Sequence, residues 1–181
     1  MISLILILLF LWHFYIGYHR GIILQVFYSL GALVSFLIAK QFYQNVAHKI
    51  SLWVPYANPP EGANMAFFKE VSLFDLSQVF YAGIAFFAIF SLAYLAFRLL
   101  GVLVHLLPIN YFNTLVYNLI SGFLALTVLL VFLSMGLSIL ATIPLPVIQN
   151  QLQDHFLLRT LIEHCPPVTT LIRQLWVKPI V

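Results

Sequence analysis

Three adjacent residues near the carboxyl end of the chain carry side chains that catalysis and metal binding often use. Glu163, His164 and Cys165 supply a carboxylate, an imidazole and a thiol. On a helix, neighbouring residues point away from one another, and no second cysteine or histidine stands at the spacing of a zinc site. We therefore interpret the cluster as polar surface, and we expect neither a metal nor another cofactor.

The distribution of acidic side chains argues against ion-coupled transport and against an intramembrane protease. The five acids all lie outside the long apolar stretches: Glu61, Glu70, Asp75, Asp154 and Glu163. Coupled carriers generally place ionisable groups inside their membrane spans. His13 is the one histidine in a span, and it serves either as a proton relay or as an aromatic-belt residue. Motifs of serine hydrolases, zinc proteases and phosphate loops are lacking, so we expect no enzyme.

The composition indicates an integral membrane protein. Of 181 residues, 63% are hydrophobic and 7% are charged, whereas a soluble domain carries roughly a quarter charged residues. So few charges cannot cover a surface in water, and the expected partner is the lipid bilayer. The net charge of +3 does not indicate nucleic-acid binding, because the eight lysines and arginines are scattered singly.

Four apolar stretches are long enough to cross a hydrocarbon core of about 30 Å. They cover residues 2–18, 22–39, 79–100 and 117–143. We therefore predict an all-α polytopic membrane protein with about four transmembrane helices. A single transmembrane domain covers 1–146 and includes an extramembrane loop over 40–78.

Amphipathic segments are expected outside the spans. Residues 41–53 have apolar positions at helical spacing and predict an interfacial helix, and prolines then break any helix. The tail, 147–181, has two apolar sets: Leu152, Phe156, Leu157, Leu161 and Ile162, then Val168, Leu171, Ile172, Leu175 and Trp176. Such helices either lie on the membrane surface or pack against the bundle or a partner protein.

A short polar interruption separates the first two spans. In Gly17-Tyr18-His19-Arg20-Gly21, two glycines flank a histidine–arginine pair and permit a tight reversal. We prefer this reversal to one continuous, bent helix, because Arg20 in mid-membrane would cost about 2.5 to 3.5 kcal/mol on insertion scales.

Small residues recur at four-residue steps in two of the spans. The sets are Gly31, Ser35 and Ala39; Ser134, Ser138 and Thr142; and the pair Ser121 and Ala125. Helices associate in lipid through close packing of such residues. We expect these positions to be helix contacts, either within the bundle or with a second copy of the chain.

The basic residues predict the orientation of the chain. In a four-span arrangement, six fall on one side: Lys40, Lys49, Lys69, Arg159, Arg173 and Lys178. Arg20 and Arg98 fall on the opposite side. Because cytoplasmic segments carry the excess of positive charge, both termini are expected in the cytoplasm.

Several of these features together resemble the bacterial colicin V production (CvpA) family. They are the Gly17-to-Gly21 turn, Ile38-Ala39-Lys40-Gln41-Phe42-Tyr43, and, before the last span, Leu107-Pro108, Asn113 and Gly122. Tyr117 stands where the pattern leads us to expect a glycine. The resemblance implies a small bacterial inner-membrane protein associated with making or exporting a peptide toxin and with envelope physiology, with no catalytic residues to carry over.

Two functions from different classes therefore remain open. The first is a non-enzymatic membrane protein that supports toxin-peptide production or secretion, with secretion-related membrane proteins as partners. The second is a small channel or permeability factor formed by oligomers of the chain. A channel needs a polar stripe through a span, and its candidates are Ser121, Ser134, Ser138 and Thr142.

Overall fold

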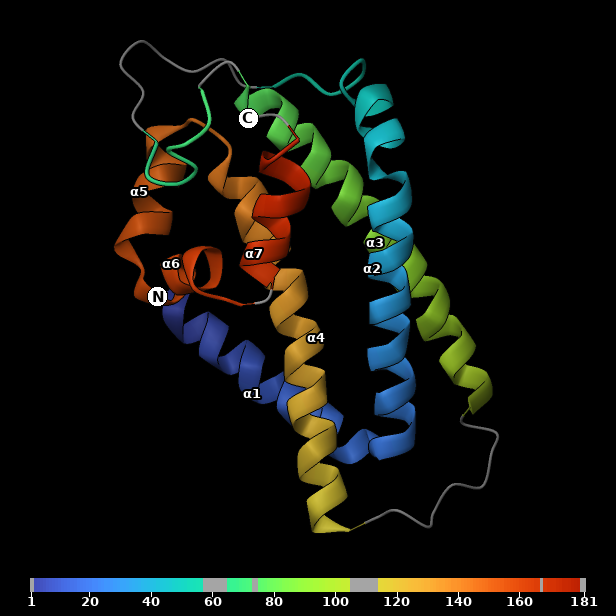
Figure 1. Cartoon of the computed structure of the whole chain (residues 1–181). Helices are drawn as coiled ribbons and strands as arrows, with labels where there is room; N and C mark the ends of the chain where they lie inside the picture. Colours follow the sequence, from blue (N-terminus) through green and yellow to red (C-terminus); the bar gives the residue numbers. More distant parts are fainter. Residues whose placement is uncertain (1, 57–64, 73–74, 105–113, 167, 180–181) are drawn as a thin grey trace. The chain divides into compact units, whose positions relative to one another are not determined.

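The computed structural model describes residues 2–56, 65–72, 75–104, 114–166 and 168–179. Throughout these residues the regular structure is helical, which confirms the predicted all-α class. Among these described residues, four helices are long and apolar enough to cross a membrane. They are α1 (Ile2–Arg20), α2 (Ile22–Ile50), α3 (Leu76–Val104) and α4 (Leu115–Ala141), drawn in Figure 1.

The chain divides into two compact units. Unit one consists of Met1–Ile38 and Ile89–Val131, and unit two consists of Ala39–Ala88 and Phe132–Val181. Helices α2, α3 and α4 contribute residues to both units, whereas α1 belongs to unit one alone.

The first two helices are separated by one residue, Gly21. Its φ of +88° lies in the left-handed region, where an L side chain is strained and glycine is not. The chain reverses there, as Figure 1 shows at the junction of α1 and α2. The expected helix break is confirmed, and the alternative of a single continuous helix is wrong.

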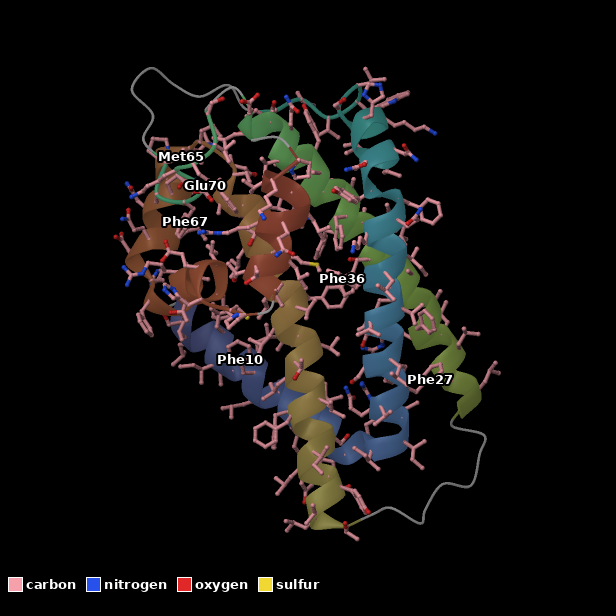
Figure 2. All side chains as sticks on the ribbon, viewed as in Figure 1. Phe10, Phe27, Phe36, Met65, Phe67 and Glu70 are labelled. Atoms are coloured by element: carbon pink, nitrogen blue, oxygen red, sulfur yellow. The ribbon has the colours of Figure 1, made fainter. Side chains whose placement is uncertain are left out.

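Two helix pairs pack closely in unit one. Helix α1 lies against α4, where the rings of Phe14 and Phe123 meet edge to face with their centroids 5.4 Å apart. Helix α2 lies against α3, where Phe27 and Phe97 are 6.2 Å apart between centroids. Figure 2 shows Phe27 on the side of α2 that faces α3. Such tilted aromatic pairs are the arrangement that ring quadrupoles favour.

The second helix is longer than the predicted span. We expected the span to end before Lys40 and an interfacial helix to cover 41–53, but one helix, α2, continues without interruption to Ile50. No glycine or proline stands between Gly31 and Pro55, so nothing interrupts the helical hydrogen-bond ladder. Residues 40–50 and 76–78 of the predicted 40–78 loop are therefore helical. Its proline-rich centre, within 57–64, lies outside the described residues.

The tail forms short helices in unit two. They are α5 (Pro146–Asp154), α6 (Phe156–Glu163), α7 (Val168–Ile172) and a π-helical turn over Arg173–Val177. Many of its apolar side chains are buried, among them Leu152, Leu158, Leu161, Ile162, Val168, Ile172 and Trp176.

The tail packs against the helices of its own unit rather than standing alone. The Trp176 ring lies 6.0 Å from that of Phe86 on α3, and Tyr43 on α2 donates a hydrogen bond of 2.7 Å to the Leu175 carbonyl. Phe156, one of the residues of the predicted apolar face, is 69% exposed. Leu158, two residues later, is buried in its place.

Candidate functional site

The turn between α1 and α2 is held by one side chain of α4. The Ser121 hydroxyl donates to the Gly17 carbonyl and, at 3.2 Å, to the Gly21 carbonyl. The Gly17 carbonyl lies in the last turn of α1 and has no partner within that helix, so an outside donor satisfies it. The Gly21 carbonyl also accepts the Gln25 amide of α2 at 3.2 Å. Ser121 is fully buried, and its hydroxyl therefore ties the turn to α4.

Gly17 lets the two helices come this close. A Cβ at this position would lie 2.5 Å from the Cβ of Ala125 and 2.9 Å from the Ser121 carbonyl oxygen. Real side chains do not approach so closely, and the nearest atoms belong to short side chains and backbone that cannot swing aside. The structure thus brings together a glycine of the turn and the small pair Ser121 and Ala125, which sequence reasoning had considered separately.

Two arginines lie against one tyrosine ring in the same unit. The guanidinium carbon of Arg20 is 4.8 Å from the centre of the Tyr28 ring, and that of Arg98 is 5.4 Å from it. Arg20 also donates a hydrogen bond of 3.0 Å to the Gln25 side chain, which is 1% exposed. We name this group, Arg20, Gln25, Tyr28 and Arg98, the arginine cluster.

Sequence reasoning placed both arginines on one side of the membrane but missed their neighbours on α2. Gln25 and Tyr28 stand one helical turn apart in an apolar stretch. A buried amide needs a hydrogen-bond partner, so the glutamine in a span was a usable signal. Nothing in the local pattern identified Tyr28 as the ring that both arginines contact.

The three small residues on α2, Gly31, Ser35 and Ala39, differ in the contacts that they make. A Cβ at Gly31 would lie 2.8 Å from the Cβ of Phe97, so this position makes a close contact with α3. Ser35 is buried, and its hydroxyl donates back to the Gly31 carbonyl of its own helix at 2.7 Å. Ala39 is fully buried in unit two.

The small-residue set on α4 faces the tail and the segment before the central loop. The Ser134 hydroxyl donates a hydrogen bond of 2.8 Å to the Leu161 carbonyl of α6. The Thr142 hydroxyl donates a hydrogen bond of 2.7 Å to the Ile139 carbonyl, three residues earlier. The Thr142 carbonyl accepts a hydrogen bond of 2.6 Å from the Tyr56 hydroxyl. The Ser138 hydroxyl is buried and has no hydrogen-bond partner among the described residues.

A buried glutamine organises the end of α4. The Gln149 side-chain nitrogen donates to the carbonyls of Ala141, at 3.0 Å, and Ile143, at 2.9 Å. Its oxygen accepts from the Ala66 amide at 3.1 Å. Figure 2 shows Met65, Phe67 and Glu70, from this segment, beside the tail helices. Gln149 thus joins three segments of unit two.

The three adjacent residues Glu163, His164 and Cys165 lie at the end of α6 and just after it. The Glu163 carboxylate is 4.0 Å from Arg159 and 3.8 Å from His164. Partial burial raises the pKa of the Cys165 thiol, which leaves less reactive thiolate at neutral pH. Within the described parts of the chain, no three histidine, cysteine or acidic residues are grouped to hold a metal ion.

Unit two also contains a pocket of about 320 Å³. It lies where the end of α2 and the start of α3 meet the tail, and its lining includes Tyr43, His48, Gln78 and Trp176. The buried Trp176 indole nitrogen has no hydrogen-bond partner among the described residues. The lining carries no acidic, lysine or arginine side chain.

Comparison with known proteins identifies the family. The sequence model of the family described as Colicin V production protein matches residues 2–166. The uncharacterized transmembrane protein YshB of Bacillus subtilis (strain 168) is 25% identical over 182 residues, which cover 98% of each chain. No solved structure matches this chain significantly.

The family match covers the turn at Gly17–Gly21, its contacts on α4 and the arginine cluster. Two parts of the resemblance, Leu107-Pro108 and Asn113, lie outside the described residues. Because the match extends over all four long helices and most of the tail, this chain belongs to the colicin V production protein family.

Proposed function

We propose that this chain is a non-catalytic, multi-pass protein of the bacterial cytoplasmic membrane that supports the production or export of a peptide toxin. The observation that carries this proposal is the family match over residues 2–166. Both termini lie in the cytoplasm in this proposal, and the protein acts through contacts with other membrane proteins of the export route or with a second copy of itself.

The structural contacts support a role in assembly rather than in chemistry. The positions that single out the family pattern, Gly17 and Gly21, make a close helix contact and a left-handed turn. Neither provides a reactive group. The acids lie outside the apolar stretches, and the one thiol has a raised pKa.

The hydrogen bonds give less support to an oligomeric channel. Three of the four hydroxyls that would line it, those of Ser121, Ser134 and Thr142, donate to carbonyls inside the protein. A pore-lining hydroxyl has to be free to replace water around the permeating species. Ser138 alone remains, and ion flux through liposomes that disappears in a Ser138→Leu variant would revive this function.

The test is a deletion strain complemented with variants of the gene. Small secreted peptides are compared by quantitative mass spectrometry, and membrane potential is recorded in parallel. We expect a selective loss of one or a few peptides in the deletion strain and their return with the wild-type chain. Unchanged peptides together with an altered potential would contradict the proposal and favour the channel.

Matched variants separate assembly from catalysis. A Glu163→Gln, Cys165→Ser double variant removes the acid and the thiol from the polar cluster and is expected to complement fully. A Gly17→Val variant, which forces α1 away from α4, is expected to fail. Membrane levels of each variant are measured by immunoblot, and loss of complementation by a well-expressed double variant would contradict a non-catalytic role.

A further inference from the structure

Unit one carries two arginines and no acidic residue. Its segments, Met1–Ile38 and Ile89–Val131, contain no aspartate or glutamate. In the described part of the chain, the ion pairs involve Arg159, His164 and Arg173, and none of them includes Arg20 or Arg98. The positive charges of the arginine cluster are therefore not neutralised by a carboxylate of that part.

The two guanidinium groups are close enough to act on each other. Both lie over the Tyr28 ring, and the charge of Arg98 acts on Arg20. Tyr94, one helical turn before Arg98, also interacts electrostatically with both. Neutral partners of this kind, a ring face and an amide oxygen, orient the two cations without cancelling their charge.

The helix end does not account for this arrangement. Arg20 is the last residue of α1, where a cation interacts favourably with the helix dipole. The carbonyls of Gly17 and Gly21, however, already accept hydrogen bonds from Ser121. Arg20 instead donates to Gln25 of α2, so its side chain is directed toward the second helix and the arginine cluster.

We propose that Arg20 and Arg98 bind the phosphate group of a phospholipid. A guanidinium presents its N–H groups in a planar fork that matches phosphate oxygens, and the phosphate charge neutralises the repulsion between the two arginines. Basic sites between membrane helices bind anionic head groups by this chemistry. This site is independent of any role in toxin production.

The surroundings of Arg98 favour a lipid over a free anion. On the same helix, Leu95, Leu99 and Val102 are exposed apolar side chains that surround Arg98 in sequence. In a membrane-spanning helix, such exposed apolar residues face acyl chains. A phospholipid offers a phosphate to the arginines and an apolar body to these leucines and the valine, whereas a free anion offers only the first.

The experiment uses the full-length chain purified in detergent, with dioleoyl phosphatidylglycerol as the probe. Native mass spectrometry measures the fraction of protein that retains lipid, and thermal unfolding is followed with and without it. Dioleoylglycerol, which has the same acyl chains and no phosphate, is the lipid control. We expect retention of phosphatidylglycerol, not of dioleoylglycerol, and a higher unfolding temperature with phosphatidylglycerol.

Two double variants each remove two positive charges, one pair inside the arginine cluster and one pair outside it. Arg20→Gln, Arg98→Gln removes the arginine cluster's charge, whereas Lys40→Gln, Lys178→Gln removes two exposed cations of unit two. We expect the first to weaken retention about tenfold or more, as for the loss of charge-assisted hydrogen bonds, and the second to leave it unchanged. Arg98→Gln alone, at an exposed side chain, gives the same test if the double variant does not fold.

Three results would overturn the proposal. Equal retention by the wild-type chain and by a folded Arg98→Gln variant places the lipid elsewhere. Equal retention of dioleoylglycerol shows that acyl chains alone are bound. Complete displacement of phosphatidylglycerol by excess inorganic phosphate assigns the arginine cluster to the free anion, with no lipid involved.

Discussion

Gly17 and Ser121 together set the distance between α1 and α4 in unit one. The glycine removes the side chain that would separate the two helices, and the serine hydroxyl bonds the carbonyls that this approach brings within reach. Where lipid replaces water, helix association depends on such close packing and on interhelical hydrogen bonds. Neither residue has a free reactive group, so their contribution is to structure.

This contact predicts opposite effects for the same substitution at two glycines. Gly17→Ala adds a methyl group 2.5 Å from Ala125 and is expected to destabilise the protein by about 1 to 3 kcal/mol. Gly136→Ala meets nothing within 4 Å and is expected to gain up to about 1 kcal/mol from helix propensity. Unfolding in detergent, followed by circular dichroism, compares them, and equal shifts would disprove the close contact.

At the scale of the element, the tail is stabilised by the side chains that it buries rather than by its own helices. Its helices are short, and isolated helices of this length are unstable in water. Trp176 is 1% exposed and packs against Phe86 of α3, while the Leu161 carbonyl accepts a hydrogen bond from Ser134 of α4. Docking on α3 and α4 is therefore what keeps the tail helical.

Removing the main anchor should release the tail. Trp176→Ala is expected to weaken docking by about 3 to 5 kcal/mol, because it leaves a large cavity. Trypsin should then cleave faster after Arg173, measured by mass spectrometry of the released peptide. Phe156→Ala, at a side chain that is 69% exposed, is the control and should leave the cleavage rate unchanged. The same rate in all three proteins would show that Trp176 does not hold the tail.

For the whole molecule, we predict that both termini lie on the same side of the membrane, because the described residues include four candidate spans, an even number. In this predicted arrangement, six of the eight basic residues belong to the side that carries the tail. By the positive-inside rule, we predict that this side is cytoplasmic. Cys165, the only cysteine and part of the tail, is a natural reporter of the orientation.

An impermeant maleimide should therefore label Cys165 in permeabilised cells and not in intact cells. Because burial raises the pKa of this thiol, its thiolate fraction is low at neutral pH and increases as the pH rises. The labelling rate should accordingly increase toward alkaline pH, where the assay is best performed. A Cys165→Ser variant shows the background, and labelling of intact cells above that background would place the tail outside.

The sequence by itself determined the class of the protein and the number of its long apolar helices. Fully apolar stretches of this length are stable only where lipid surrounds them and every backbone amide is bonded within the helix. The break at Gly21 was also predictable, because the glycine and the adjacent Arg20 each disfavour a continuous helix through the membrane. These conclusions depend on residue type and on local spacing.

The tertiary structure alone decided which residues meet. Ser121 was a plausible packing residue, but its acceptors, Gly17 and Gly21, are about a hundred positions away in sequence. The continuation of α2 beyond Lys40 and the ring shared by Arg20 and Arg98 were likewise not predicted. The physical reason is that periodicity specifies the face of a helix, whereas the partner on that face depends on how whole helices pack together.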